Sequence, residues 1–167
     1  DNKGTWYTAQ VVSYSLFTGN TEVAKLFAEQ AKGRVQVAIN PDGTMPIELK
    51  RTRSFHYHKY HLQAFFDLAV LSQRIGVDLF NYETKDGRGL RRALEFLIPY
   101  GIGQKRWPHQ QIDEVRYGIM AELLHRAAIY YDDKKYQELE AKVPQAKAGD
   151  ATLISYFDLV EPPVIKQ

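Results

Sequence analysis

The spacing of the apolar residues constrains the fold of this chain more than any other feature of its sequence. Along nearly the whole chain these residues recur every three or four positions, which places them on one face of a helix. The longest such run is His109 to Tyr131, with apolar side chains at Ile112, Val115, Ile119, Leu123, Ala127 and Tyr130. No strand ladder and no short repeat stands out, so the pattern predicts an all-α protein.

Capping and turn residues divide the chain into six predicted helices. Asn20 or Thr21 is a suitable cap for the second helix, and Ser54 is the expected N-cap of the third. Asn40-Pro41-Asp42-Gly43 and Lys85-Asp86-Gly87 are turn sequences. The predicted helices cover residues 5–17, 21 toward 39, 54 to just before 76, 90–98 and 109–131, with a short one around 136–143.

The sequence also predicts the structure of the segments at the ends of these helices and between them. Val35, Val37 and Ile39 alternate as in a strand, although helix is preferred there. Residues 45–53 are expected to form a structured loop, because Pro46 opposes a helix. Pro99 is expected to end the fourth helix, and residues 153–160 could pack onto the body of the protein.

Composition restricts the class of protein further. A chain of 167 residues that is 44% hydrophobic fits one domain with a real core. There is no cysteine, which excludes a disulfide framework and thiolate metal sites. The net charge of +2 does not indicate nucleic acid or an acidic membrane, and no run is long enough to span a bilayer. The chain starts at Asp1 with no leader, so we expect it to be cut from a larger protein.

The most informative stretch is Glu48 to His61, where four basic side chains stand among aromatic residues and imidazoles at a predicted helix start. The first turn of a helix has free N–H groups and a positive dipole, which together with the cations would form a receptor for carboxylates. Uronic acids carry one carboxylate per sugar, and sugar rings stack on aromatic side chains. The pattern alone still favours a solvated basic loop that leads into a core helix.

Three blocks of sequence make this stretch more specific. They are Asn2 to Tyr7 (NKGTWY), Glu48 to Tyr57 (ELKRTRSFHY) and Gly76 to Leu79 (GVDL). In order and spacing the chain resembles the alginate lyase superfamily over residues 2 to about 131. The resemblance implies part of an incomplete (α/α) toroid of antiparallel helix hairpins. Residues 1–167 would then be a single domain, the C-terminal catalytic portion of a larger toroid. The N-terminal helices would come from the same protein or from a companion chain.

The resemblance also implies a reaction, the β-elimination of alginate or a glucuronan to give 4,5-unsaturated uronate ends. Asn2 and Arg51 would neutralise the uronate carboxylate, and Tyr57 would protonate O4 and, in syn elimination, also remove the C5 proton. A loop before Ser54 would have to fold the Arg51 guanidinium back toward Tyr57, where Arg51 and Arg53 would favour a phenolate. No cofactor is implied, and the location would be secreted or periplasmic.

Further residues are candidates for substrate binding. They are Lys3, Arg53, His56, His58, Tyr60 and Trp107. Lys3 stands where the family usually has His, and because Lys is a poor base it favours syn over anti elimination. It also leaves open a degenerate relative that only binds polyuronates. A helical scaffold or repeat protein is the alternative from another class.

Other chemistries have less support in the sequence. His58 and His61 share a helix face, but His56 points elsewhere and no third ligand is evident, so we expect no metal site. Glu48 and Asp67 could supply the two carboxylates of a glycoside hydrolase, yet nothing in the sequence pairs them. Glu48 is expected instead to orient Arg51 or Arg53.

Overall fold

The computed structural model describes residues 1–144, and over that range it contains helices and isolated bridges but no strand. This confirms the all-α prediction. No helix in that range is long and apolar enough to cross a membrane. The helices are α1 (Asn2–Phe17), α2 (Thr21–Ala38), α3 (Pro46–Leu49), α4 (Ser54–Gln73), α5 (Leu90–Gly101), α6 (Gly118–Tyr130) and α7 (Lys135–Glu140).

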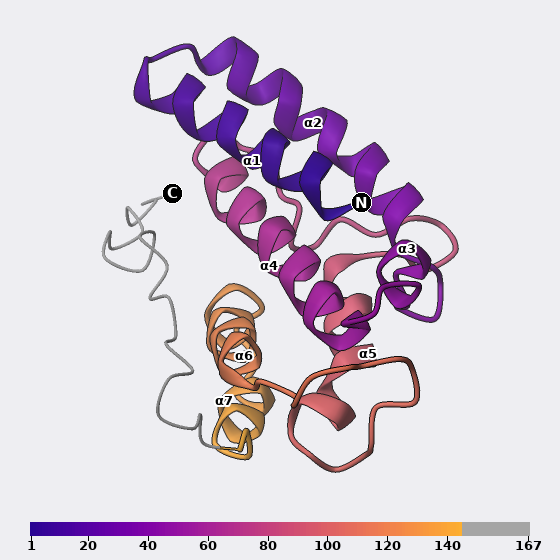
Figure 1. The fold of residues 1–167 in the computed structure, drawn as a ribbon. Helices are drawn as coiled ribbons and strands as arrows, with labels where there is room; N and C mark the ends of the chain where they lie inside the picture. Colours follow the sequence, from indigo (N-terminus) through magenta and orange to yellow (C-terminus); the bar gives the residue numbers. More distant parts are fainter. Residues whose placement is uncertain (145–167) are drawn as a thin grey trace.

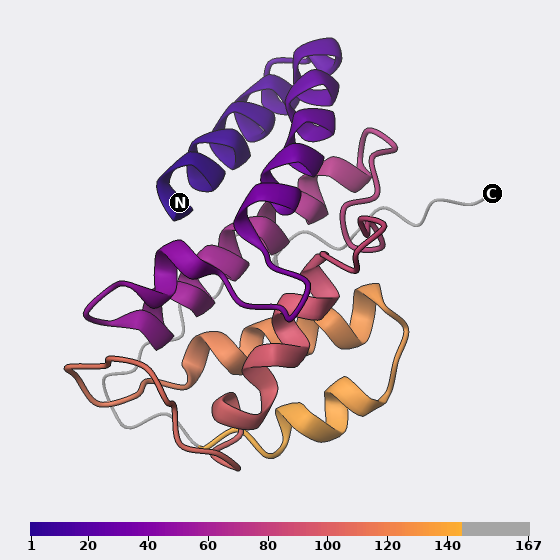
Figure 2. The same ribbon diagram turned by 90° about the vertical axis from the view of Figure 1, so that its right-hand side faces the viewer.

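The helices are arranged around α4. In Figure 1, α1 and α2 form an antiparallel hairpin, and α4 runs alongside α1 with α3 at one end. Figure 2, turned by 90°, shows α5 and α6 on the side of α4 away from this hairpin. Helix α4 therefore contacts α1, α2, α3, α5 and α6, and α7 packs on α6.

Helix α4 can occupy the centre because its second half is apolar on almost every side. Leu62, Phe65, Phe66 and Leu68 are all fully buried. Each such side chain contributes roughly 1.5–3 kcal/mol when it is removed from water. The ring of Phe66 meets that of Phe80 edge to face at 5.2 Å, so the connector after α4 joins the same core.

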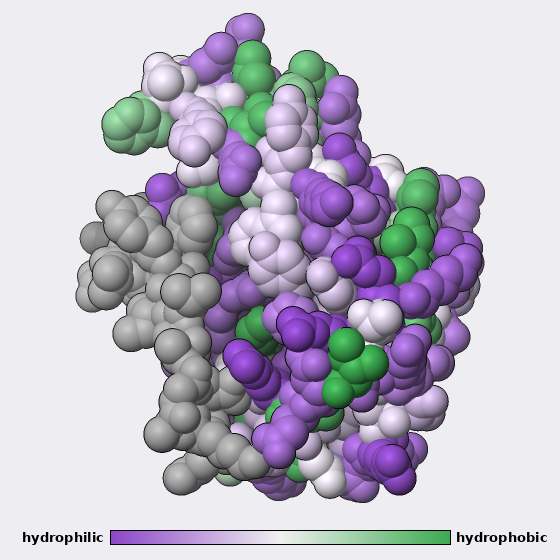
Figure 3. All heavy atoms as spheres, in the orientation of Figure 1, coloured by the Kyte–Doolittle hydropathy of each residue, from purple (hydrophilic) through white to green (hydrophobic). Residues whose placement is uncertain are grey.

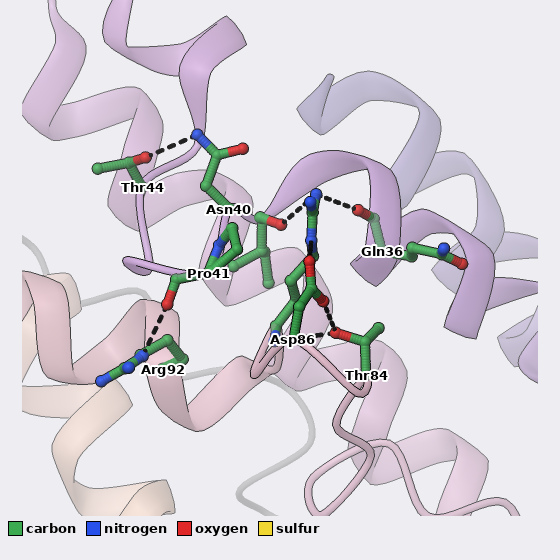
Figure 4. Close-up of polar contacts among 9 residues, drawn as sticks. Gln36, Asn40, Pro41, Thr44, Thr84, Asp86 and Arg92 are labelled. Atoms are coloured by element: carbon green, nitrogen blue, oxygen red, sulfur yellow. Dashed lines mark hydrogen bonds and ion pairs between the residues drawn. The ribbon is translucent and has the colours of Figure 1, made fainter.

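Two arginines fasten the segment around α5 to the end of α2 (Figure 4). The Arg88 guanidinium donates to the carbonyl oxygens of Gln36 at 3.0 Å and Ile39 at 3.3 Å, and Asp86 accepts from it at 2.8 Å. Arg92 donates to the Pro41 carbonyl at 2.9 Å. These contacts satisfy carbonyl groups at and just beyond the C-terminal end of α2, which have no partner inside the helix.

Several helix and turn boundaries agree with those predicted from the sequence. Helix α2 continues to Ala38, so helix was the right choice over strand there. The turn at residues 40–43 is present, with the Gly43 N–H donating to the Asn40 carbonyl at 2.9 Å. Gly43 has φ +89°, and a Cβ at this position would lie 2.4 Å from the Arg92 carbonyl oxygen, so the turn requires glycine.

Other boundaries differ from the predictions. Residues 109–117 are not helical and α6 begins at Gly118, so the predicted long helix is wrong in its first part. Residues 46–49 form α3, because a proline in the first turn of a helix loses no hydrogen bond. Pro99 lies inside α5 rather than at its end. Because proline has no N–H, this position lacks one backbone hydrogen bond close to the C-terminal end of the helix. The segment 153–160 lies outside the described residues.

Candidate functional site

Arg51 and Tyr57 meet at the start of α4. Arg51 lies in the short segment between α3 and α4, and its guanidinium carbon is 3.8 Å from the centre of the Tyr57 ring. At this distance a guanidinium is attracted electrostatically to the face of the ring. Both side chains are half-buried. The expected folding back of Arg51 toward Tyr57 is confirmed, and the pair places a fixed cation beside a phenol at the protein surface.

Tyr57 belongs to a row of aromatic rings on the outer side of α4. His56 meets Tyr57 edge to face at 5.4 Å and stacks on Tyr60 at 5.9 Å, and Tyr60 lies 5.1 Å from Trp6 of α1. Burial lowers the pKa of His56, and the charges of Lys59 and Arg53 lower it further. His56 is therefore a neutral ring at neutral pH, suited to packing and hydrogen bonding.

The loop between α5 and α6 covers the N-terminus of α4. The backbone N–H of Ser54 donates to the Gln110 carbonyl at 3.1 Å, and that of Phe55 donates to the Gln111 side chain at 3.1 Å. The loop therefore occupies two of the N–H groups that the predicted carboxylate receptor would use, and carboxylate binding at this helix start stays a prediction. Ser54 is the first helical residue and not the N-cap, and its hydroxyl donates to the same Gln110 carbonyl.

Arg53 and Trp107 also hold this loop. Arg53 pairs with Asp113 at 2.7 Å, with both side chains at least a third exposed. The indole N–H of Trp107 donates to the Ser54 hydroxyl at 2.7 Å, and its ring lies 5.0 Å from those of Phe55 and Tyr100. Both residues contribute to local structure, and their predicted contact with substrate stays a prediction.

His58 occupies a different environment from its neighbour Tyr57. Its side chain is fully buried, with its ring 5.3 Å from Phe96 and 6.1 Å from Trp107. Burial lowers its pKa to about 3, so the ring is neutral. The prediction that His58 binds substrate is wrong for this structure, because the side chain has no surface to offer.

Asn2, the first residue of α1, is buried against Glu48 of α3. The backbone N–H of Asn2 donates to Oε1 of Glu48 at 2.9 Å, and its amide nitrogen lies 3.2 Å and 3.1 Å from the two carboxylate oxygens. The amide nitrogen therefore donates to Glu48 inside the protein. The Glu48 carboxylate contacts α1 and α4, so Glu48 does not orient Arg51 or Arg53 through a direct ion pair.

His61 completes this buried group. Its Nδ1 lies 3.1 Å from Oε1 of Glu48, and its Nε2 lies 2.8 Å from the Thr5 hydroxyl. A neutral imidazole with its lone pair on Nε2 accepts from the Thr5 hydroxyl, and its Nδ1 side makes a close polar contact with the carboxylate. The sequence suggested His61 only as a possible metal ligand. The signal it missed is the spacing, since His61 lies one helical turn after Tyr57.

The remaining candidates are placed as follows. Lys3 is exposed on α1, next in sequence to the buried Asn2. Figure 3 shows this face, where side chains of intermediate hydropathy, the class that includes Tyr and Trp, gather over α1 and the adjacent part of α4. Asp67 pairs with Arg126 at 2.5 Å inside the core, so it forms no hydrolase pair with Glu48. Within residues 1–144 no group of three or more His, Cys, Asp or Glu could hold a metal ion.

The helix hairpins packed around α4 define an all-α fold of the kind expected for part of an (α/α) toroid. The sequence model of the alginate lyase family matches residues 1–107. A crystal structure of an alginate lyase from Bacteroides ovatus is similar, with a TM-score of 0.82 and 32% sequence identity over 89% of this chain. The chain belongs to the alginate lyase family. It spans 40% of the length of that solved chain. No curated protein matches it.

Proposed function

We propose that the protein cleaves alginate or a related polyuronate by β-elimination, with Tyr57 as the proton-transferring residue. The observation that carries this proposal is the Arg51 guanidinium 3.8 Å from the Tyr57 ring, on a half-exposed surface of a chain that belongs to the alginate lyase family. Tyr57 is accessible enough to meet a sugar, and the nearby cation favours the charge that develops in the reaction.

The reaction needs a base at C5 and an acid at O4 of the scissile linkage. The phenolate of Tyr57 removes the C5 proton, the electron pair of that bond forms the C4–C5 double bond, and the C4–O4 bond breaks. The proton taken by Tyr57 passes to O4, so one residue serves both steps from the same side of the sugar. The exposed Lys3 does not supply a separate base, which fits this syn route.

The C5 proton is removed readily only when the adjacent carboxylate is neutralised, because otherwise two negative charges build up next to each other. Arg51 can do this, since a guanidinium matches a carboxylate with two parallel hydrogen bonds. The predicted contribution of Asn2 would require its amide to leave Glu48. Arg51 is therefore the neutralising residue on which the proposal depends.

We further propose that the rest of the cleft is built by other helices of the same protein or of a companion chain. Tyr7, Tyr14 and Phe17 lie on one side of α1 and are 58%, 68% and 89% exposed. Large aromatic residues this exposed along one helix face usually mark an interaction surface. A polymer such as alginate would be met outside the cytoplasm, so the proposed location is secreted or periplasmic.

The test is an ultraviolet assay for 4,5-unsaturated uronate with polymannuronate, polyguluronate and glucuronan as substrates. Arg51→Gln should lower turnover by about 10²–10³, the usual loss when one charge-stabilising donor is removed. Lys50→Gln is the matched control, since it removes the same charge from an exposed neighbouring residue. Wild-type turnover in Arg51→Gln would contradict the assignment, and no product from any of the three polymers would contradict the activity.

A binding-only relative is the second candidate, and the exposed Lys3 in place of the family's histidine is the observation that favours it. Such a protein would bind polyuronates, as measured by calorimetry, without producing unsaturated ends. If the wild-type protein, which contains Arg51, binds polyuronates but forms no unsaturated product, the result favours the binding-only relative over the lyase.

A further inference from the structure

The buried group around Glu48 joins three helices directly behind the Arg51–Tyr57 pair. Asn2 and Thr5 come from α1, Glu48 from α3 and His61 from α4. Glu48 and His61 are 0% and 2% exposed, so neither reaches a substrate. A charged carboxylate at this depth is costly unless several donors surround it, and here the donors come from two other helices. Such an arrangement fixes how the three helices meet.

Glu48 is connected to Arg51 through the backbone. The Arg51 N–H donates to the Glu48 carbonyl at 3.1 Å, so the residue whose side chain is held by Asn2 and His61 also fixes the start of the segment that carries the guanidinium. That segment leaves α3 and enters α4 within a few residues. A shift of α3 against α1 would therefore move Arg51 relative to Tyr57.

His61 connects the same group to Tyr57 through α4. The two residues are four positions apart, which places them about one turn apart along the helix. His61 is buried against Glu48 and Thr5, whereas Tyr57, one turn earlier, is half-buried against Arg51. The inner contacts thus set the distance between α3 and the turn of α4 from which Tyr57 projects.

The ionisation of the group supports this description. Burial by itself would raise the pKa of Glu48, but the hydrogen bond from His61 and the N–H donors of Asn2 outweigh burial, and the pKa is lowered. Burial lowers the pKa of His61, and Glu48 offsets this only in part. At neutral pH the group is therefore a carboxylate surrounded by neutral donors, a fixed acceptor for α1 and α4.

We propose that Glu48 and His61 are positioning residues, which hold Arg51 over the ring of Tyr57 by tying α3 to α1 and α4. This inference rests on the proposed function, because it assigns these residues to the geometry of the same reaction. It does not give either residue contact with the sugar or a proton to transfer.

The first experiment measures turnover in Glu48→Gln, which keeps the shape of the side chain and removes its charge. We expect kcat to fall by about 10²-fold, the typical effect of displacing a catalytic group by about 1 Å, with KM close to that of the wild type. Glu22→Gln, a substitution of an exposed residue of α2, is the control and should retain wild-type kinetics. A purely structural role would lower the folded fraction but leave kcat per folded molecule unchanged.

The second experiment needs no activity, so it separates failure of this inference from failure of the proposed function. Side-chain protons of Arg51 lie over an aromatic ring and should show an upfield NMR shift that disappears in Tyr57→Leu. Glu48→Gln should also reduce this shift. His61→Gln gives a second variant in case Glu48→Gln does not fold. Folded variants of both residues with wild-type kcat and an unchanged Arg51 shift would overturn the inference.

Discussion

The first two turns of α4 present two faces made of the same types of residue in opposite environments. On the outer face, His56, Tyr57 and Tyr60 are half-buried, and the Arg51 guanidinium lies against the ring of Tyr57. On the inner face, His58 and His61 are buried and contact aromatic rings, Glu48 and Thr5. Tyr57 and His58 are adjacent in sequence, yet only one of them is available for chemistry.

This difference shows that a basic and aromatic segment cannot be assigned to a function as a whole. In a helix, neighbouring residues point about 100° apart, so a cluster that is continuous in sequence is divided between surface and core. The outer face is expected to meet the substrate, and the inner face to stabilise the fold and hold the outer face in place. Substitutions on the two faces should therefore have different effects on the protein.

The largest effect on stability is expected where the second half of α4 meets α6. The Arg126 guanidinium lies between the carboxylates of Asp67, at 2.5 Å, and Glu122, at 2.9 Å, and all three side chains are almost fully buried. Arg126→Met removes the cation from between two buried carboxylates, which should cost about 3–5 kcal/mol. Urea unfolding measures this loss, with the exposed Arg74→Met as a control. A change below about 1 kcal/mol would show that these charges are not buried in solution.

A smaller, pH-dependent effect is expected for His58. Its pKa is about 3 in the folded protein and 6.5 in an exposed chain, so between these values the unfolded state binds a proton that the folded state does not. Stability should therefore fall as the pH drops below about 6.5, with His58 contributing about 1.4 kcal/mol per pH unit.

Replacing His58 with Leu should remove this part of the pH dependence and leave the rest. Thermal melts between neutral and mildly acidic pH measure the difference between the variant and the wild type. His125→Gln is the control, because His125 is exposed on α6. If His58→Leu retains the wild-type pH dependence, His58 is accessible to protons in the folded protein, and the contrast with Tyr57 is lost.

The smallest effect on stability is expected at the Arg53–Asp113 pair, which links the outer face of α4 to the loop before α6. Both side chains are at least a third exposed, so the pair is screened by water and salt. Asp113→Asn should change the free energy of unfolding by less than about 1 kcal/mol, and by less still at high salt. A larger loss that persists at high salt would mean that this loop contributes to the core.

The sequence predicted the all-α class of fold because the apolar spacing that indicates a helix depends only on residues close together in the chain. It predicted α1, α2, α4 and the turn at residues 40–43, where the apolar period agrees with the Asn20 cap of α2 and with the glycine of the turn. It failed over residues 109–117, where the spacing of Ile112 and Val115 fits a helix. In the structure Ile112 is 63% exposed and its N–H donates to the Thr52 carbonyl. Pairing with a segment far away in sequence overrode the local pattern.

The sequence could predict those contacts of the site that depend on residue type and on position in the helix. It could not predict those that depend on which other helices pack against the residue. The contact of Arg51 with Tyr57 followed from a loop of suitable length before α4. The burial of His58 and the engagement of Asn2 by Glu48 depend on which helices pack around them. Only the folded chain brings Glu48, His61 and Thr5 together, because they come from three different helices.

The measurement that tests the central claim most directly is the initial rate of unsaturated uronate formation by Tyr57→Phe. The substitution removes one hydroxyl from a half-buried ring that keeps its contacts with Arg51 and His56, so the melting temperature should stay near that of the wild type. The rate should fall by at least about 10²-fold, as expected when a general acid–base group is removed. A Tyr57→Phe protein that keeps the wild-type rate on the same polymer would contradict the account.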